Sequence, residues 1–197
     1  MTDLLTDALP TVWEGRRIDP DFRHMVRLLN GFRRAGSDDD KLTLLRQAAA
    51  GLYRDPVPPA EEPEALEGLL RFLTAPEQDL PGRGSADPAP GVLPFDYAAD
   101  GAYILAAFRQ LYGMDLTTDK VHWWLFRALL QGALAEECLF ARIVYWRTAD
   151  TSGMTPEQRQ DIEDKRSRFA LPDGLKGVKR NETLQDHEEA FLARFAR

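Results

Sequence analysis

The sequence contains one cysteine, Cys138, among 197 residues. One cysteine cannot form a disulfide within the chain, and it excludes a zinc site made of cysteines alone. No uncharged run approaches the ~20 residues that a membrane span needs. The first residues, Met-Thr-Asp-Leu-Leu-Thr-Asp, carry acids where a signal peptide has basic residues. We therefore expect a soluble protein of a reducing cytoplasm, with no membrane partner.

Sequence motifs of catalysis are also scarce. The chain has no phosphate-binding glycine loop, no nucleophile elbow and no histidine pair at metal-binding spacing. We expect a non-enzymatic protein without cofactor or metal. One enzymatic alternative is a small helical hydrolase that uses His122 with Asp115 or Asp119. The competing interpretation is a buried His122 that is hydrogen-bonded to one of these carboxylates.

Positive charge is in short supply. The sequence has 25 basic and 32 acidic side chains, which gives a formal net charge of −7. Residues 1–100 carry the whole excess, with 11 basic and 18 acidic side chains, whereas residues 101–197 carry 14 of each. Binding to nucleic acid or to an anionic membrane requires clustered positive charge. The charge therefore argues against a nucleic-acid partner.

Apolar residues recur at helical spacing along most of the chain, which predicts a mainly α fold. We expect a single helical domain of about seven helices. A small hairpin is predicted near the N-terminus, because Val12 and Trp13 favour a strand and Glu14-Gly15 favours a turn. Helix-start signals are expected at Asp19-Pro20, Asp38, Pro63, Asp96, Thr118-Asp119, Glu136 and Thr155-Pro156, and a final amphipathic helix at 183–196.

Proline and glycine divide the chain. Residues 75–94 hold five prolines and three glycines and little apolar material, which predicts a loop or linker. The expected organisation is an N-terminal hairpin and helices at 1–74, a Pro/Gly-rich loop at 75–95, and a helical core at 96–197. We expect these parts to form one folded unit.

The densest group of aromatic residues lies between residues 96 and 147. Tyr103, Phe108 and Tyr112 belong to one predicted apolar stripe. Another predicted helix carries the block Trp123, Trp124 and Phe126 and is apolar around almost its whole circumference, which favours a central position. The tryptophans either lie at the boundary of the core or are exposed and anchor a protein partner.

Three segments of this region closely resemble the bacteriophage gp-fifteen family. They are Asp100-Gly-Ala-Tyr-Ile-Leu-Ala-Ala-Phe, Tyr112-Gly-Met-Asp-Leu and His122-Trp-Trp-Leu-Phe-Arg-Ala-Leu-Leu. The family pattern runs Asp, Tyr-Ile, Phe, Tyr-Gly-Ile-Asp-Leu and His-Trp-Trp-Lys-Phe. Here Met114 replaces the usual isoleucine and Leu125 the usual lysine. The resemblance covers most of residues 1–171 and includes Asp115 in the second segment.

The resemblance implies a phage tail assembly protein that acts as a chaperone-like factor in the cytoplasm of the bacterial host. Its expected partners are the tape-measure protein or an early tail complex, and an upstream tail chaperone. An alternative is a structural tail-completion or connector protein that stays in the virion. The residues expected to form the core or the partner surface are Tyr103, Phe108, Tyr112, Asp115, His122, Trp123, Trp124 and Phe126.

Overall fold

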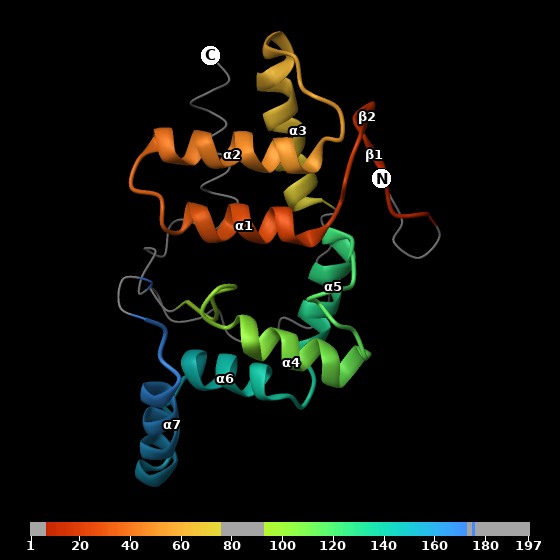
Figure 1. Ribbon diagram of the computed structural model, residues 1–197. Helices are drawn as coiled ribbons and strands as arrows, with labels where there is room; N and C mark the ends of the chain where they lie inside the picture. Colours follow the sequence, from red (N-terminus) through yellow and green to blue (C-terminus); the bar gives the residue numbers. More distant parts are fainter. Residues whose placement is uncertain (1–6, 76–92, 173–174, 176–197) are drawn as a thin grey trace. The chain divides into compact units, whose positions relative to one another are not determined.

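The computed structural model describes residues 7–75, 93–172 and 175 (Figure 1). Within them the chain forms two short strands, one 3-10 helix and seven α-helices. The predicted mainly α fold with an N-terminal hairpin is confirmed. The predicted helix at 183–196 and residues 76–92 of the Pro/Gly-rich loop lie outside the described residues. The elements are β1 (Val12–Trp13), β2 (Arg16–Arg17), α1 (Phe22–Phe32), α2 (Asp38–Leu52), η1 (Pro59–Glu61), α3 (Glu62–Thr74), α4 (Gly101–Tyr112), α5 (Trp123–Ala133), α6 (Leu139–Thr148) and α7 (Pro156–Arg168).

The described residues fall into two compact units. The first unit contains residues 7–75 and 120–127, and the second contains residues 93–119 and 128–172. The first five residues of α5 therefore belong to the first unit, and its remaining residues belong to the second. The division of the chain into residues 1–74, 75–95 and 96–197 stays a prediction. No helix among the described residues is both long and apolar enough to cross a membrane.

The hairpin of the first unit turns at Glu14 and Gly15. Both residues have positive φ, 48° and 79°, as expected for a tight turn between two antiparallel strands. Trp13 pairs with Arg16 across the hairpin, and its Nε1 donates to the carbonyl of Gly68 in α3 at 2.8 Å. A Cβ at Gly68 would lie 2.6 Å from the Glu14 carboxylate. Glycine at this position therefore permits the close approach of the hairpin to α3.

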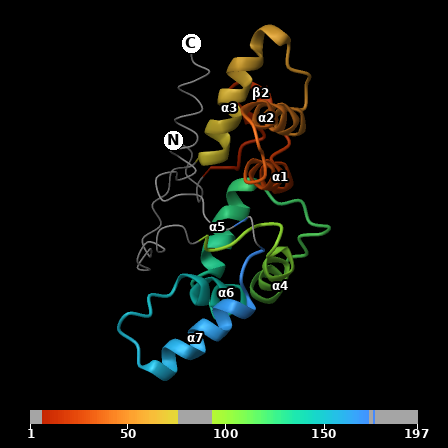
Figure 2. The same cartoon turned by 90° about the vertical axis from the view of Figure 1, so that its left-hand side faces the viewer.

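Helices α1 and α2 lie side by side in both views, and α3 runs across them (Figures 1 and 2). The N-cap of α1 is Asp21, whose side chain accepts from Arg23 N. The predicted start at Asp19-Pro20 is thus two residues too early. The reason is a long-range pairing, because Phe22 N donates to Val121 O at 2.9 Å and Trp123 N to Pro20 O at 2.8 Å.

Helix α2 begins after the N-cap Ser37, with three acids in its first turn. The positive end of the helix stabilises carboxylates in its first turn. Asp38–Asp40 therefore mark a helix start, as predicted. Apolar side chains from the hairpin and from α1, α2 and α3 make the core of the first unit. The fully buried ones are Ile18, Met25, Leu28, Leu45, Leu52, Leu69 and Phe72.

In the second unit, α4 and α6 lie side by side and α7 packs on α6 (Figure 1). Helix α4 ends at Gly113, whose φ of 69° is the left-handed conformation predicted for its stop. Helix α7 begins with the predicted capping box, because Thr155 and Gln158 each bond to the other's backbone N–H. Ile143, Trp146 and Ile162 form a buried cluster between α6 and α7.

A buried ion pair joins the elements of the second unit. The Arg147 guanidinium donates to both oxygens of Asp100, at 2.7 and 2.9 Å. It also donates to the carbonyls of Phe169 at 2.7 Å and Pro94 at 3.2 Å. The two charged residues are only 7% and 1% exposed. One side chain of α6 thereby holds the start of α4, the segment before it and the end of α7.

We expect Asp100→Asn to destabilise the protein by about 3–5 kcal/mol, because it leaves the Arg147 charge buried without its counter-ion. The measurement is the free energy of unfolding in urea. Asp55→Asn is the matched control, because Asp55 also accepts two hydrogen bonds from an arginine, Arg17, but on the surface. It should leave the unfolding midpoint nearly unchanged.

A double-mutant cycle with Arg147→Met separates the pair from its surroundings. The double variant should lose less stability than the sum of the two single variants. Additive losses would show that the ion pair itself contributes no coupling.

Candidate functional site

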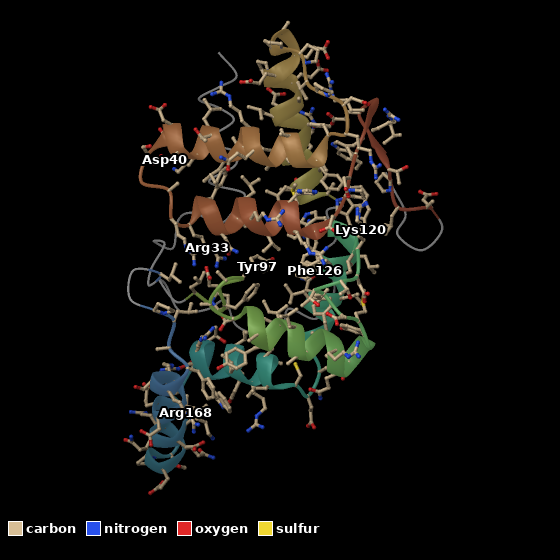
Figure 3. All side chains as sticks on the ribbon, in the orientation of Figure 1. Arg33, Asp40, Tyr97, Lys120, Phe126 and Arg168 are labelled. Atoms are coloured by element: carbon tan, nitrogen blue, oxygen red, sulfur yellow. The ribbon has the colours of Figure 1, made fainter. Side chains whose placement is uncertain are left out.

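The structure divides the eight predicted site residues between the two units. His122, Trp123, Trp124 and Phe126 lie in the first unit, whereas Tyr103, Phe108, Tyr112 and Asp115 lie in the second. Figure 3 labels Lys120 and Phe126, which bracket the start of α5. The residues around this start form the best-defined group, and they are described first.

The predicted start of this helix at Thr118-Asp119 is wrong. Helix α5 begins at Trp123, and His122 forms an isolated antiparallel bridge with Asp21. The local capping signal serves a turn instead, because the Asp119 side chain accepts from Asp115 N at 2.8 Å. The pairing with residues 20–22 holds the segment before Trp123 in an extended conformation. Long-range backbone hydrogen bonds therefore override the local helix propensity.

His122 uses both ring nitrogens on the backbone. Its Nδ1 accepts from Trp124 N at 3.1 Å, so the imidazole caps the first turn of α5. Its Nε2 lies 3.2 Å from the carbonyl oxygen of Pro10. Together these contacts favour the tautomer with the proton on Nε2. The expected bond to Asp115 or Asp119 is wrong, because these partners are backbone groups on either side of the ring.

Trp123, Trp124 and Arg127 cap the C-terminal end of α3 with their side chains. Trp123 Nε1 donates to Leu73 O and Trp124 Nε1 to Phe72 O, both at 2.9 Å. One nitrogen of Arg127 donates to Leu73 O, Thr74 O and Ala75 O at 2.9 to 3.2 Å. The last carbonyls of a helix have no partner within the helix itself. The start of α5 therefore supplies the donors for the C-terminal end of α3.

Aromatic rings surround this junction. The Trp124 ring meets Trp13 edge-on at 5.6 Å and Phe72 at 5.3 Å. Phe126 stacks on Phe22 with ring centroids 4.3 Å apart. Trp123 and Trp124 are each 2% exposed and Phe126 is 1% exposed. The interpretation of the tryptophans as exposed partner anchors is wrong in this structure, because their rings are part of the core.

The remaining predicted residues have separate roles in the second unit. Phe108 is fully buried, and Tyr103 packs against the cluster of α6 and α7. Tyr112 donates its hydroxyl to Leu129 O at 2.8 Å. Asp115 accepts from Thr117 N at 3.0 Å, and the hydrogen bonds of Thr117 lower the pKa of this carboxyl below its usual value. These four residues belong to a different unit from His122 and the tryptophans, and their contacts are made within that unit.

Sequence reasoning missed Arg127, Arg147 and Asp100 as structural residues. Arg127 is the one basic residue of the apolar helix α5, and this was its only signal, whereas α6 carries both Arg142 and Arg147. The bonds of Arg127 to Leu73 and of Arg147 to Asp100 span 54 and 47 residues, so local spacing gives no indication of these pairings. Among the described residues, no three His, Cys, Asp or Glu side chains are grouped closely enough to hold a metal ion.

The comparison with protein-family models gives one match. The model of the bacteriophage Gp15 protein matches residues 7–171. The chain belongs to the bacteriophage Gp15 family. No curated protein and no solved structure matches it. In this Gp15 protein, the His-Trp-Trp segment is a structural junction, and residues 172–197 follow the matched region.

Burial affects the titration of two histidines in the first unit of the Gp15 protein. Desolvation lowers the pKa of His122 below its ordinary 6.5, and the Pro10 carbonyl opposes this in part. Desolvation also lowers the pKa of His24, against the opposing effect of Asp19 and Asp21. Both side chains therefore favour the neutral form in the folded protein.

We expect His122→Ala to cost about 1 kcal/mol, because it removes the side-chain cap of α5. His122→Asn keeps an oxygen acceptor at the cap and should lose less. Urea unfolding of the three proteins at pH 8, where the histidine is neutral, is the measurement. Equal losses in both variants would show that the cap contributes nothing.

The lowered pKa of His122 predicts a dependence of stability on pH. Its full contribution is present above the unfolded-state pKa of 6.5, and it is lost as the pH falls toward the folded-state pKa. The wild-type free energy of unfolding should therefore fall more steeply below pH 6.5 than that of His122→Asn. His24 titrates in both proteins and cancels in the comparison. Parallel curves would contradict the prediction.

Proposed function

We propose that this Gp15 protein is a tail assembly factor that acts as a non-enzymatic, chaperone-like binder. Its proposed partner is the tape-measure protein, alone or in an early tail complex, in the cytoplasm of the bacterial host. An upstream tail chaperone is a further proposed partner. The family match carries the proposal, since it makes the chain a bacteriophage protein. We infer the role in tail assembly from the resemblance of the sequence motifs to this family.

The surface of the second unit supports a binding role. Leu105 on α4 is 38% exposed, and Leu139 and Tyr145 on α6 are 45% and 52% exposed. Leu139 and Tyr145 line one open groove, and exposed apolar side chains that share a surface are typical of protein-binding sites. A tape-measure chain is long, helical and apolar, and it must be kept from aggregating before the tail tube polymerises. An acidic, helical protein with an apolar face is suited to this task.

The contacts of His122 argue against the hydrolase alternative. A histidine that acts as a general base needs a free ring nitrogen within reach of its substrate. Here one nitrogen caps α5, the other faces Pro10 O, and neither contacts Asp115 or Asp119. A non-enzymatic function is therefore the proposal. The alternative is a structural tail-completion or connector protein. Such a protein stays in the mature phage particle, whereas an assembly factor does not.

The test is co-expression with the tape-measure protein encoded by the same phage. We expect this protein to raise the soluble fraction of the tape-measure protein and to co-purify with it. An unrelated small helical protein expressed in its place controls for non-specific effects on solubility. A tape-measure protein that is equally soluble with either partner would overturn the chaperone-like role.

Mass spectrometry of purified phage separates the two tail functions. An assembly factor should be absent from mature virions, although it is present in infected cells. Recovery in stoichiometric amount with the tail proteins would instead support the structural alternative.

A further inference from the structure

The second unit contains an open groove of about 590 Å³ beside the N-terminal half of α6. Its apolar side chains come from two places. Leu134 lies in the turn after α5, whereas Leu139 and Tyr145 lie on the exposed face of α6. Leu139 and Tyr145 are about half exposed, so nothing among the described residues covers them. The family match and the resemblance assign no role to this groove.

The wall of the groove is held in place by polar contacts. Cys138 caps α6, since its Sγ donates to Ala133 O at 3.4 Å and accepts from Ala141 N at 3.5 Å. Gln110 of α4 donates to Glu137 O at 3.4 Å, which ties the turn to the neighbouring helix. The fold therefore forms the groove before any partner binds, so little binding free energy is lost in ordering it.

The charges around the groove are arranged asymmetrically. Glu136 and Glu137 are exposed in the turn at one end. Neither carboxylate forms an ion pair with a basic side chain in the described part of the chain. Farther along α6, the Arg142 guanidinium lies over the Trp146 ring, 5.1 Å from its centroid. The groove thus offers a negative end, an apolar middle and a positive side chain one turn beyond the cap.

We propose that this groove binds an amphipathic helix of the tape-measure protein, an inference that rests on the proposed function. The complementary helix presents large apolar side chains to Leu134, Leu139 and Tyr145. It carries a lysine or arginine at the end that meets Glu136 and Glu137, and an acidic residue about one to two turns away, near Arg142.

The chemistry of the groove selects this class of occupant over others. Adjacent carboxylates repel phosphate groups, which makes a nucleic acid or an anionic lipid a poor fit. A helix laid in an apolar groove buries its side chains at helical spacing against Leu139 and Tyr145, which both line the groove and are about 1.7 turns apart on α6. The tryptophans at the start of α5 take no part, since they are buried in the first unit.

The test uses overlapping segments of the tape-measure protein from the same phage, with binding measured by calorimetry. Leu139→Lys should raise the Kd of the best-binding segment roughly tenfold or more, because it places a charge in the apolar middle. Leu125→Lys is the matched control. Leu125 is also a leucine on a helix surface, 40% exposed against 45% for Leu139, but it lies outside the groove. The Leu125→Lys variant should therefore bind the segment with the Kd of the wild type.

Charge reversal tests the proposed polarity. The double variant Glu136→Lys with Glu137→Lys should weaken binding, and reversal of the basic residue in the segment should restore it. Far-ultraviolet circular dichroism of each variant confirms that it is folded. Restoration by the paired reversal cannot result from a folding defect.

A photo-crosslinking residue at Tyr145 identifies the occupant directly. We expect crosslinks to the tape-measure segment, and none from the same residue placed at Arg168, which is exposed on α7 (Figure 3). Crosslinks to a second copy of this chain, or to residues 176–197, would overturn the inference.

The two proposals fail in different ways. A segment that binds the wild type and Leu139→Lys equally well overturns the groove and leaves the chaperone-like role intact. If the wild type binds no segment, the proposed function fails, and this inference fails with it.

Discussion

The first unit depends on a requirement of the backbone at the end of α3. The last carbonyls of that helix point into a buried environment, where an unpaired carbonyl costs free energy comparable to a lost hydrogen bond. Two indole nitrogens and one guanidinium, all from the start of α5, bond to these carbonyls. The same segment pairs with the residues before α1. These donors join α3 to the start of α5, and the backbone pairing joins α1 to the same segment.

The second unit satisfies its buried polar groups in a different way. Arg147 donates two hydrogen bonds to the Asp100 carboxylate within the core, and it donates to two backbone carbonyls as well. A buried ion pair is weak evidence for stability, but loss of one partner is costly. In both units an arginine bonds to several backbone carbonyls: Arg127 to those at the end of α3 in the first, and Arg147 to those of Pro94 and Phe169 in the second.

The sequence predicted those features whose signals are local. The turn at Glu14-Gly15, the stop at Gly113 and the capping box of Thr155 and Gln158 each depend on residues within four positions, and all three were predicted. The start of α5 was not, because Thr118 and Asp119 carry a capping signal that the chain uses in a turn. The residues of the candidate site were found through their resemblance, but the roles of Trp123 and Trp124 depend on carbonyls 50 and 52 residues away, and His122 faces Pro10, 112 residues away.

The expectation for the tryptophans shows the same limit. Their pattern was compatible with a core and with a binding surface, and only the carbonyls of α3 distinguish the two. Phe108, Trp123, Trp124 and Phe126 are buried and Tyr103 and Tyr112 are partly buried, whereas Leu105, Leu139 and Tyr145 have exposed apolar surface.

The burial of the His-Trp-Trp junction has a consequence for how such proteins diversify. Trp123, Trp124 and Phe126 belong to the pattern by which the chain resembles its family, and they are buried where helices of the first unit meet. The side chains of Glu136, Glu137, Leu139 and Tyr145, in the turn and on the outer face of α6, are exposed and take no part in this packing. Substitutions of these four side chains can therefore change the groove without breaking the buried contacts of Trp123, Trp124 and Phe126.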